Sequence, residues 1–137
     1  MRVALDEFAT LPKRAHSTDA GLDLYSRNEA IVPAHGSATF DTGVHIELPH
    51  NTAGVLVSKS GLNVNHGITS TGLIDEGYTG PIKVKLYNHS NIDYFVKKGA
   101  KISQLVIMPV SYVQVEVTDS ILSDSDRGTN GFGSTGE

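Results

Sequence analysis

The chain has no cysteine among its 137 residues. Disulfide bonds, thiolate zinc sites and cysteine nucleophiles are therefore excluded together. The chain also lacks an uninterrupted apolar run of about 18 residues, so the sequence predicts neither a membrane-spanning helix nor a secretory leader. We expect a cytoplasmic protein that has no membrane partner.

Positive charge is also in short supply. Eleven Lys and Arg residues stand against fifteen Asp and Glu residues, which gives a formal net charge of −4 at pH 7. This balance has the wrong sign for broad affinity to a phosphate backbone, so we expect no nucleic-acid partner. An anionic ligand would have to be held by a few cations in fixed positions.

Short apolar runs, in contrast, recur along the chain. Stretches rich in Val, Ile, Leu, Thr and Tyr show alternation and are separated by Gly, Pro, Asn, Asp and Ser, which is typical of strands. The expected strands are residues 2–4, 22–26, 30–32, 38–40, 44–48, 54–57, 73–74, 82–88, 93–96, 101–109 and 113–117. Only residues 60–63 have room for a helical turn, because no segment keeps a helical period over about ten positions. The pattern predicts an all-β fold, either a jelly roll or a barrel-like sandwich.

The composition changes near the end of the chain. After Val117, the residues Ser, Asp, Gly and Thr dominate. We therefore expect one β-barrel domain over residues 1–118, in a chain whose length suits a single hydrophobic core. Residues 119–137 are predicted to form a flexible glycine-rich arm.

The most informative segment runs from Gly72 to Gly80 with the sequence GLIDEGYTG. Two strand-like pieces flank an Asp-Glu-Gly turn, which predicts a β-hairpin whose backbone polar groups are partly unpaired at its mouth. A carboxylate at the strand end, Asp75, is placed either to remove a proton from an attacking water or to cap the turn. Tyr78 is either a core residue or a flat wall against a sugar.

A second segment runs from Arg127 to Gly136 with the sequence RGTNGFGSTG. Its glycines let the backbone approach a ligand, its hydroxyl and amide groups suit phosphate oxygens, and an arginine suits a terminal phosphate. Phe132 has no apolar neighbours in the sequence, which favours stacking on a base or on a neighbouring subunit. The alternative is a plain flexible linker.

Three weaker segments carry charged groups beside glycine. Residues 58–62 place a lysine and two hydroxyls at the start of the one helical turn, where an anion is favoured. Residues 97–104 form a basic turn that leads into a strand, although lysines there also keep an edge strand soluble. Residues 20–23, with the sequence AGLD, place the carboxylate of Asp23 near a glycine at a strand start, where it could serve a hydrated magnesium ion or simply a turn. The six histidines show no paired metal-ligand spacing.

Taken in order, these five segments resemble the five motifs of the trimeric dUTPase family, over a stretch from Ala20 to Gly136. The resemblance implies a jelly-roll-like subunit and a homotrimer whose active sites are shared between subunits. It also implies Mg²⁺-dependent hydrolysis of dUTP to dUMP and pyrophosphate by attack of water at the α-phosphate. This reaction keeps uracil out of DNA and supplies dUMP for thymidylate synthesis.

The resemblance also assigns roles to residues. Asp75 corresponds to the catalytic base, Tyr78 to the residue that packs under deoxyribose, and Asp23 to the aspartate that reaches the metal through water. Uracil would be read mainly by backbone groups in residues 69–74. The implied substrate contacts are Lys59, Ser60, Gly61, Thr69, Leu73, Ile74, Tyr78, Lys83, Gln104, Arg127, Phe132, Gly133, Ser134 and Thr135.

The chain departs from the family pattern at several positions. Lys59 stands where the family usually has Arg, which replaces a bidentate phosphate grip by a point charge. Ala100 stands where Asp is usual, and Asn130 stands where Gly is usual. The segment 65–71 is expected to be a loop that is shorter than in many relatives.

Two other functions are compatible with the sequence. A dCTP deaminase would share the fold but would use a glutamate base, and Glu76 beside Asp75 is expected to belong to the turn. A jelly-roll module that binds a nucleotide or a protein without turnover is the second alternative. An additional regulatory protein partner is compatible with either function.

Overall fold

The computed structural model describes residues 1–121. Within them, the chain forms ten strands and one short helix. These elements are β1 (Arg2–Leu5), β2 (Leu22–Tyr25), β3 (Ala30–Val32), β4 (Ser37–Asp41), β5 (Val44–Glu47), β6 (Thr52–Val57), α1 (Ser60–His66), β7 (Ile68–Ile74), β8 (Lys83–Asn88), β9 (Tyr94–Val96) and β10 (Lys101–Pro109). No helix in this part of the chain is long and apolar enough to cross a membrane.

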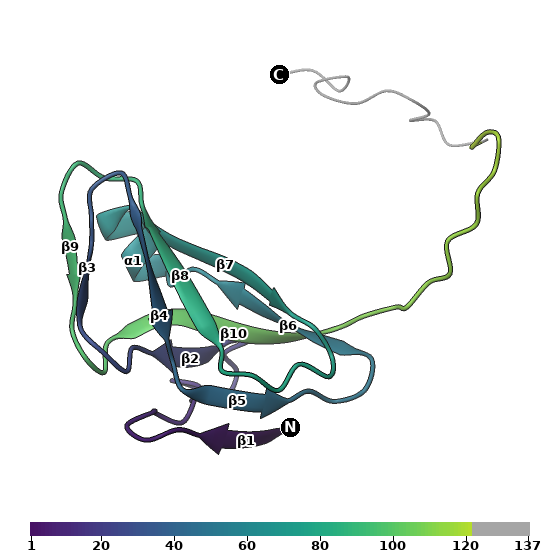
Figure 1. The fold of residues 1–137 in the computed structure, drawn as a ribbon, viewed down its shortest axis with the longest axis horizontal. Helices are drawn as coiled ribbons and strands as arrows, with labels where there is room; N and C mark the ends of the chain where they lie inside the picture. The colour runs from purple at the N-terminus through teal and green to yellow at the C-terminus, as the bar shows by residue number, and fades with distance from the viewer. Residues whose placement is uncertain (122–137) are drawn as a thin grey trace.

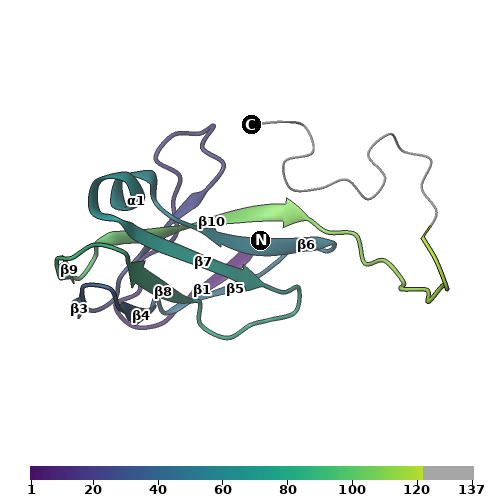
Figure 2. The same ribbon diagram turned by 90° about the horizontal axis from the view of Figure 1, so that it is seen from above.

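The strands form one large antiparallel sheet and two small ribbons. The six-stranded sheet has the order β2-β10-β6-β7-β8-β4, and β1-β5 and β3-β9 are two-stranded ribbons. Figure 1 shows the large sheet curling into a half-barrel, with β1-β5 along one side and β3-β9 at one end. In both views, α1 lies near the end formed by β3-β9, and the chain after β10 leaves at the opposite end (Figure 2). The predicted all-β, jelly-roll-like fold is confirmed.

The core follows the period-two pattern of the sequence. Along β8, Val84, Leu86 and Asn88 are buried while the residues between them are exposed. The buried amide of Asn88 is satisfied, because its Nδ2 donates to the carbonyl of Val32 at 3.0 Å and to that of Ile92 at 2.8 Å. These bonds attach the β3-β9 ribbon to the large sheet, since a buried polar group needs a partner.

One predicted strand is not formed. Residues 113–117 carry the expected alternation, but they are neither paired nor buried in the chain as described, and Val113, Val115 and Val117 are 77%, 89% and 94% exposed. The prediction was wrong because a strand requires a partner for its backbone groups, which local alternation does not supply.

The segment 65–71 also differs from its predicted form. Helix α1 continues beyond the predicted turn to His66 and ends at Gly67, whose φ of 64° is the left-handed conformation typical of a helix C-terminus. Strand β7 begins directly afterwards at Ile68. The expected loop is therefore a helix end followed by a strand.

We predict that Leu105→Ala lowers the free energy of unfolding by about 2–5 kcal/mol, the range for deleting a buried leucine side chain. Leu105 lies in β10 and is fully buried, so the truncated side chain leaves a cavity in the centre of the core. Urea denaturation measures the change. The matched control is Leu11→Ala, because Leu11 is 46% exposed. Equal losses in both variants would contradict this view of the core.

Candidate active site

The hairpin predicted over Gly72–Gly80 is not formed as a tight hairpin, because Tyr78–Gly80 are in no strand and residues 75–82 connect β7 to β8. Strand β7 instead divides its pairing between two neighbours. Residues 68–70 of β7 pair with β8, ending at Ser70↔Leu86. Residues 71–74 pair instead with β6, ending at Gly54↔Ile74. In the described part of the chain, the edge of β7 that faces β8 is therefore unpaired from Thr71 to Ile74, which agrees with the unpaired backbone groups expected near Asp75.

The partly buried Ser58 and the buried Ser70 and Ser103 support this division. The hydroxyl of Ser58 accepts a hydrogen bond from the Ser70 amide at 2.9 Å and donates to the Ser70 carbonyl at 3.1 Å. The Ser70 hydroxyl lies 2.9 Å from that of Ser103, which donates to the Val57 carbonyl at 3.0 Å. Ser58 thus makes the two backbone hydrogen bonds that a neighbouring strand would otherwise make with Ser70. Its hydroxyl is used for these bonds and not for a phosphate.

The open mouth holds a pocket with a volume of about 250 Å³. Its lining residues are Leu56, Gly72, Leu73, Ile74, Asp75, Tyr78, Pro81, Ile82 and Lys83. Five of the residues expected at the substrate, Leu73, Ile74, Asp75, Tyr78 and Lys83, are thus brought together. The pocket combines an apolar floor with backbone polar groups, a combination typical of small-molecule sites.

Tyr78 forms one wall of this pocket. Its side chain is 48% exposed, and its hydroxyl donates to the carbonyl of Pro81 at 3.2 Å. The ring folds back over Gly80, where an added Cβ would collide with the Tyr78 hydroxyl. A glycine at position 80 is therefore required for this orientation of the ring.

The two adjacent carboxylates of the turn have different environments. Glu76 is held by His50 Nδ1 at 2.6 Å, by the backbone amide of Asn51 at 2.9 Å and by the Tyr112 hydroxyl at 2.7 Å. The hydrogen bond from Tyr112, followed by those from Asn51 and His50, holds the pKa of Glu76 below its usual range. The side chain of Asp75 is exposed and makes no hydrogen bond within residues 1–121. Glu76 therefore fixes the turn, and Asp75 is the carboxylate that is free to act on a ligand.

A second polar cluster surrounds Asp23, which is only 2% exposed. Its Oδ1 lies 2.6 Å from Lys59 Nζ and 3.5 Å from Gln104 Nε2, and its Oδ2 lies 2.7 Å from Lys101 Nζ. Burial acts to raise the pKa of Asp23, but the hydrogen bonds from Lys101 and Lys59 outweigh it, and the pKa is lowered. The ionised carboxylate thus holds two cations in fixed positions.

This cluster limits how Asp23 could serve a metal ion. No group of three or more His, Asp or Glu side chains that could hold a metal occurs in the described part of the chain. Both carboxylate oxygens of Asp23 already accept bonds from ammonium groups, although Oδ2, with one partner, keeps a lone pair. That fits contact through a water of a hydrated magnesium ion, which retains several waters, and not direct coordination.

The remaining predicted residues lie in several places. Ser60 and Gly61 are exposed at the start of α1, where Lys59 is the N-cap residue and makes no side-chain cap bond. Thr69 lies at the end of β7 that pairs with β8, where its hydroxyl is 2.8 Å from His89 Nε2, so it is outside the pocket. The predicted contacts Arg127, Phe132, Gly133, Ser134 and Thr135 lie outside the described residues.

The pocket and the Asp23 cluster lie toward opposite ends of β6. Ile74 of the pocket pairs with Gly54, whereas Gln104 of the cluster pairs with Val57. Among residues 1–121, no side-chain hydrogen bond or ion pair joins the two groups. A single chain therefore presents two separate partial sites.

Lys101 is the residue of the cluster that sequence reasoning missed. The sequence indicates that the basic segment 97–104 could contact a phosphate, but it does not single out Lys101. Its partner Asp23 lies far away in the sequence, and only the pairing of β10 with β2 brings the two together. The one available signal was that a buried carboxylate requires a cationic partner.

The curled antiparallel barrel, with a heterocycle-sized pocket and a cationic cluster, defines a small β-barrel enzyme that acts on a nucleotide. The family model for dUTPase matches residues 7–136, and the chain belongs to the dUTPase family.

Relatives across the length of the chain agree with this assignment. The chain is 50% identical to the deoxyuridine 5'-triphosphate nucleotidohydrolase of Clostridium acetobutylicum, over 96% of this chain and 92% of that protein. It is 41% identical to the enzyme of the same name from Debaryomyces hansenii, over 100% of this chain and 88% of that protein.

Solved structures of similar proteins show the same fold. The dUTPase of Staphylococcus bacteriophage 80alpha with dUpNHpp superimposes with a TM-score of 0.92 at 28% identity, covering 99% of this chain and 98% of that chain. A mutant dUTPase of phage phi11 of S. aureus, described with a structural Mg(II) ion, superimposes with a TM-score of 0.80 at 26% identity, covering 87% and 96%.

We predict that Asp23→Asn lowers the free energy of unfolding at pH 7 by about 1.5–3 kcal/mol, the scale of hydrogen bonds to charged groups. Because folding lowers the pKa of Asp23, its stabilisation is present above the unfolded pKa of about 3.9 and is lost as the pH falls through the folded pKa. Urea denaturation from neutral to acidic pH should show the two proteins converging.

The control is Glu29→Gln, which changes an exposed carboxylate to an amide. Its stability should track the unchanged protein at every pH. A difference between Asp23→Asn and the unchanged protein that stays constant into strong acid would contradict the ion-pair account.

Proposed function

We propose that this chain hydrolyses dUTP to dUMP and pyrophosphate, with Asp75 activating the water that attacks the α-phosphate. Membership of the dUTPase family assigns the enzyme class and the substrate. The observation that supports the mechanism is the pocket at the open end of β7, which places a carboxylate beside backbone groups, both without a hydrogen-bond partner within residues 1–121.

Asp75 suits the role of general base better than its neighbour. A general base must reach the proton that it removes, and it needs a free acceptor atom. Both oxygens of Glu76 are engaged by the His50, Asn51 and Tyr112 groups. This arrangement favours hydrolysis at phosphorus over a deaminase that uses a glutamate base.

The pocket also accounts for the proposed choice of base and sugar. The unpaired backbone groups from Thr71 to Ile74 would pair with the edge of uracil, and a cytosine would leave buried polar groups unmatched at about 1–3 kcal/mol each. The ring of Tyr78, fixed over Gly80, would lie under deoxyribose and clash with a ribose 2'-hydroxyl. We do not assign Thr69 a direct contact, because it lies outside the pocket.

The triphosphate would be held by the Asp23 cluster and the start of α1. Lys59, Ser60, Gly61 and Gln104 are the proposed contacts. Lys59 supplies a point charge where an arginine would supply a fork, and Lys101 adds a second ammonium group beside it. Mg²⁺ bound across the phosphates would neutralise charge, with Asp23 reaching it through water.

A homotrimer would complete the site. The pocket and the cluster are separate within one chain, so a neighbouring copy has to bring its cluster to this pocket. The exposed alternating side chains of Val113, Val115 and Val117 would be buried at such a contact, since exposed apolar rows of this kind mark interfaces.

The end of the chain would cover the substrate. We propose that residues 1–118 form the barrel and that residues 119–137 form an arm, in which Arg127 holds the γ-phosphate and Phe132 stacks on uracil. Gly133, Ser134 and Thr135 would complete the cover, and exclusion of water would align the reacting groups. We place the enzyme in the cytoplasm, where it would keep uracil out of DNA and supply dUMP. A further regulatory protein partner stays a prediction.

The test of this function is a Mg²⁺-dependent pyrophosphate-release assay across the eight common ribonucleoside and deoxyribonucleoside triphosphates and dUTP. We expect rapid release from dUTP and little from any other, because base and sugar are both selected. Ammonia release from dCTP is measured in parallel, and its appearance would favour the deaminase alternative. Inertness toward dUTP with Mg²⁺ would refute the proposed function.

We predict that Asp75→Asn retains dUTP binding but lowers kcat about a hundredfold or more, the scale expected of a general base. Calorimetry measures binding, and single-turnover kinetics measure the chemical step. Glu7→Gln, a carboxylate-to-amide change at an exposed position, serves as the control and should leave both unchanged. Normal turnover of Asp75→Asn would remove Asp75 from the mechanism.

A further inference from the structure

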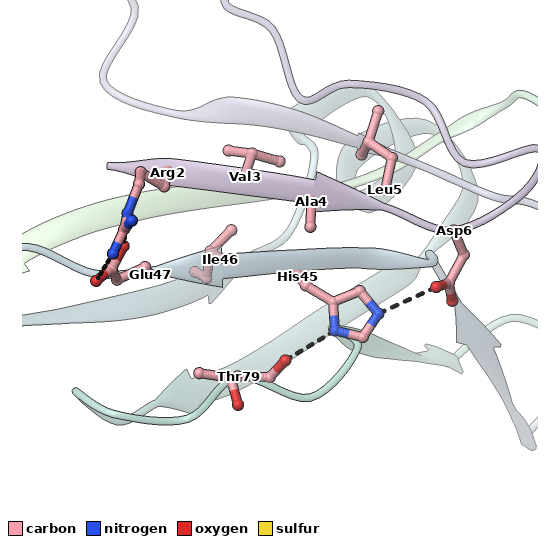
Figure 3. A pocket seen from close by; sticks show the side chains of 9 residues that line it. All are labelled: Arg2, Val3, Ala4, Leu5, Asp6, His45, Ile46, Glu47 and Thr79. Atoms are coloured by element: carbon pink, nitrogen blue, oxygen red, sulfur yellow. Dashed lines mark hydrogen bonds and ion pairs between the residues drawn. The ribbon is translucent and has the colours of Figure 1, made fainter.

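A groove of about 500 Å³ lies along β1 and β5, separate from the substrate pocket. His45 lies in β5, opposite Ala4 of β1. Figure 3 shows its ring reaching across the groove, with one nitrogen toward the backbone of Thr79 and the other toward Asp6. Thr79 directly follows Tyr78, so the groove and the substrate pocket share one loop.

Both nitrogens of His45 face groups that can only accept a hydrogen bond. Nδ1 lies 2.7 Å from the carbonyl oxygen of Thr79, and Nε2 lies 3.3 Å from Oδ1 of Asp6. A neutral imidazole has one N–H group and can serve one of these acceptors, whereas an imidazolium serves both. The geometry therefore fits the charged ring.

Acidic and basic side chains alternate in the chain of ion pairs that begins at this ring. Asp6 also accepts from Arg27 at 3.1 Å, and Arg27 lies 3.4 Å from Asp41 at the end of β4. Arg2 and Glu47, which line the same groove, are paired with each other. The bond from Thr79, followed by Asp6 and the negative charge of Asp41, raises the pKa of His45, while burial opposes them.

Glu76 fixes the start of the loop that follows Asp75, and the Tyr78 hydroxyl donates to Pro81 within the loop, but beyond Glu76 the loop has few bonds to other segments in the described chain. Gly77 has a φ of 88°, a conformation that glycine adopts freely. Within residues 1–121, the Thr79 carbonyl is the only backbone group from Gly77 to Gly80 that is hydrogen-bonded to another segment, apart from the Tyr78 amide that closes the turn on Asp75. The bond to His45 is thus the backbone link between the Tyr78 loop and strand β5.

We propose that His45 is a positioning residue for the dUTPase site, which as an imidazolium holds Thr79 and thereby fixes Tyr78 against the substrate. This inference rests on the function proposed above. Loss of the ring proton leaves a single N–H for two acceptors, and one of the two neutral forms turns a lone pair toward the Thr79 carbonyl. The loop then loosens, and the substrate binds less tightly.

Steady-state hydrolysis of dUTP tests the role of the side chain. We expect His45→Ala to raise KM about fivefold or more, the scale of one net hydrogen bond, with kcat changed by less than about twofold. His45→Asn keeps an amide donor near the position of Nδ1 and should restore KM to about the wild-type value at acidic pH. The control is His16→Gln. His16 lies 3.3 Å from Asp19 on an exposed loop, the same distance that separates His45 from Asp6.

The pH profile separates positioning from a merely structural role. From about pH 6 to about pH 9, a range that brackets the ordinary histidine pKa of about 6.5, wild-type KM should rise relative to that of His45→Asn. The titration of dUTP itself cancels in this ratio, because both enzymes bind the same substrate. A ratio that is constant with pH, or a KM for His45→Ala equal to that of the wild type, would overturn the proposal.

A measurement independent of turnover keeps this inference distinct from the proposed function. In NMR spectra of the full chain, the ring of His45 should titrate above its ordinary pKa, and the amide signals of Tyr78 and Thr79 should shift with it. If Tyr78 does not follow the titration, the inference is wrong even when the enzyme is active. If Tyr78 follows it but dUTP is not hydrolysed, the proposed function has failed instead. If His45→Ala does not fold, the His45→Asn variant and this titration test the proposal in its place.

Discussion

The structure depends on how β7 divides its backbone hydrogen bonds. Its first residues pair with β8 and its last residues with β6, and Ser70 lies where the pairing changes. A buried backbone group requires a partner, and the hydroxyl of Ser58 provides it at this point for both the amide and the carbonyl of Ser70. Because β7 leaves β8 here, the hairpin opens, and its mouth becomes the pocket that contains Asp75 and Tyr78.

Neighbouring residues of the same type acquire different roles from their surroundings. Asp75 and Glu76 are adjacent carboxylates in one turn. Glu76 lies against the turn before β6 and against Tyr112 after β10, so three donors hold it in place. Among residues 1–121, Asp75 has no such contacts, and its exposed side chain lines the pocket. Contacts from elsewhere in the chain thus separate a structural carboxylate from one suited to proton transfer.

The acidic chain obtains a site for an anion by concentrating a few cations. The buried carboxylate of Asp23 holds Lys59 and Lys101 within 2.7 Å or less, and burial makes this pairing obligatory. Two ammonium groups on one carboxylate leave a local excess of positive charge, while the chain as a whole carries −4. A triphosphate needs such a local excess, and net charge does not reveal it.

The sequence by itself determined the all-β class, the helical turn at Ser60 and the turn after Ile74, because alternation, turn residues and glycines act over a few neighbouring positions. It also indicated the family through the order of its motifs. The tertiary structure decided that residues 113–117 form no strand, that β7 begins at Ile68, and that Lys101 pairs with Asp23 and His45 with Thr79. Local pattern reports which face of a segment is apolar, but strand pairing and ion pairs join residues far apart in the chain, and only the folded barrel chooses among them.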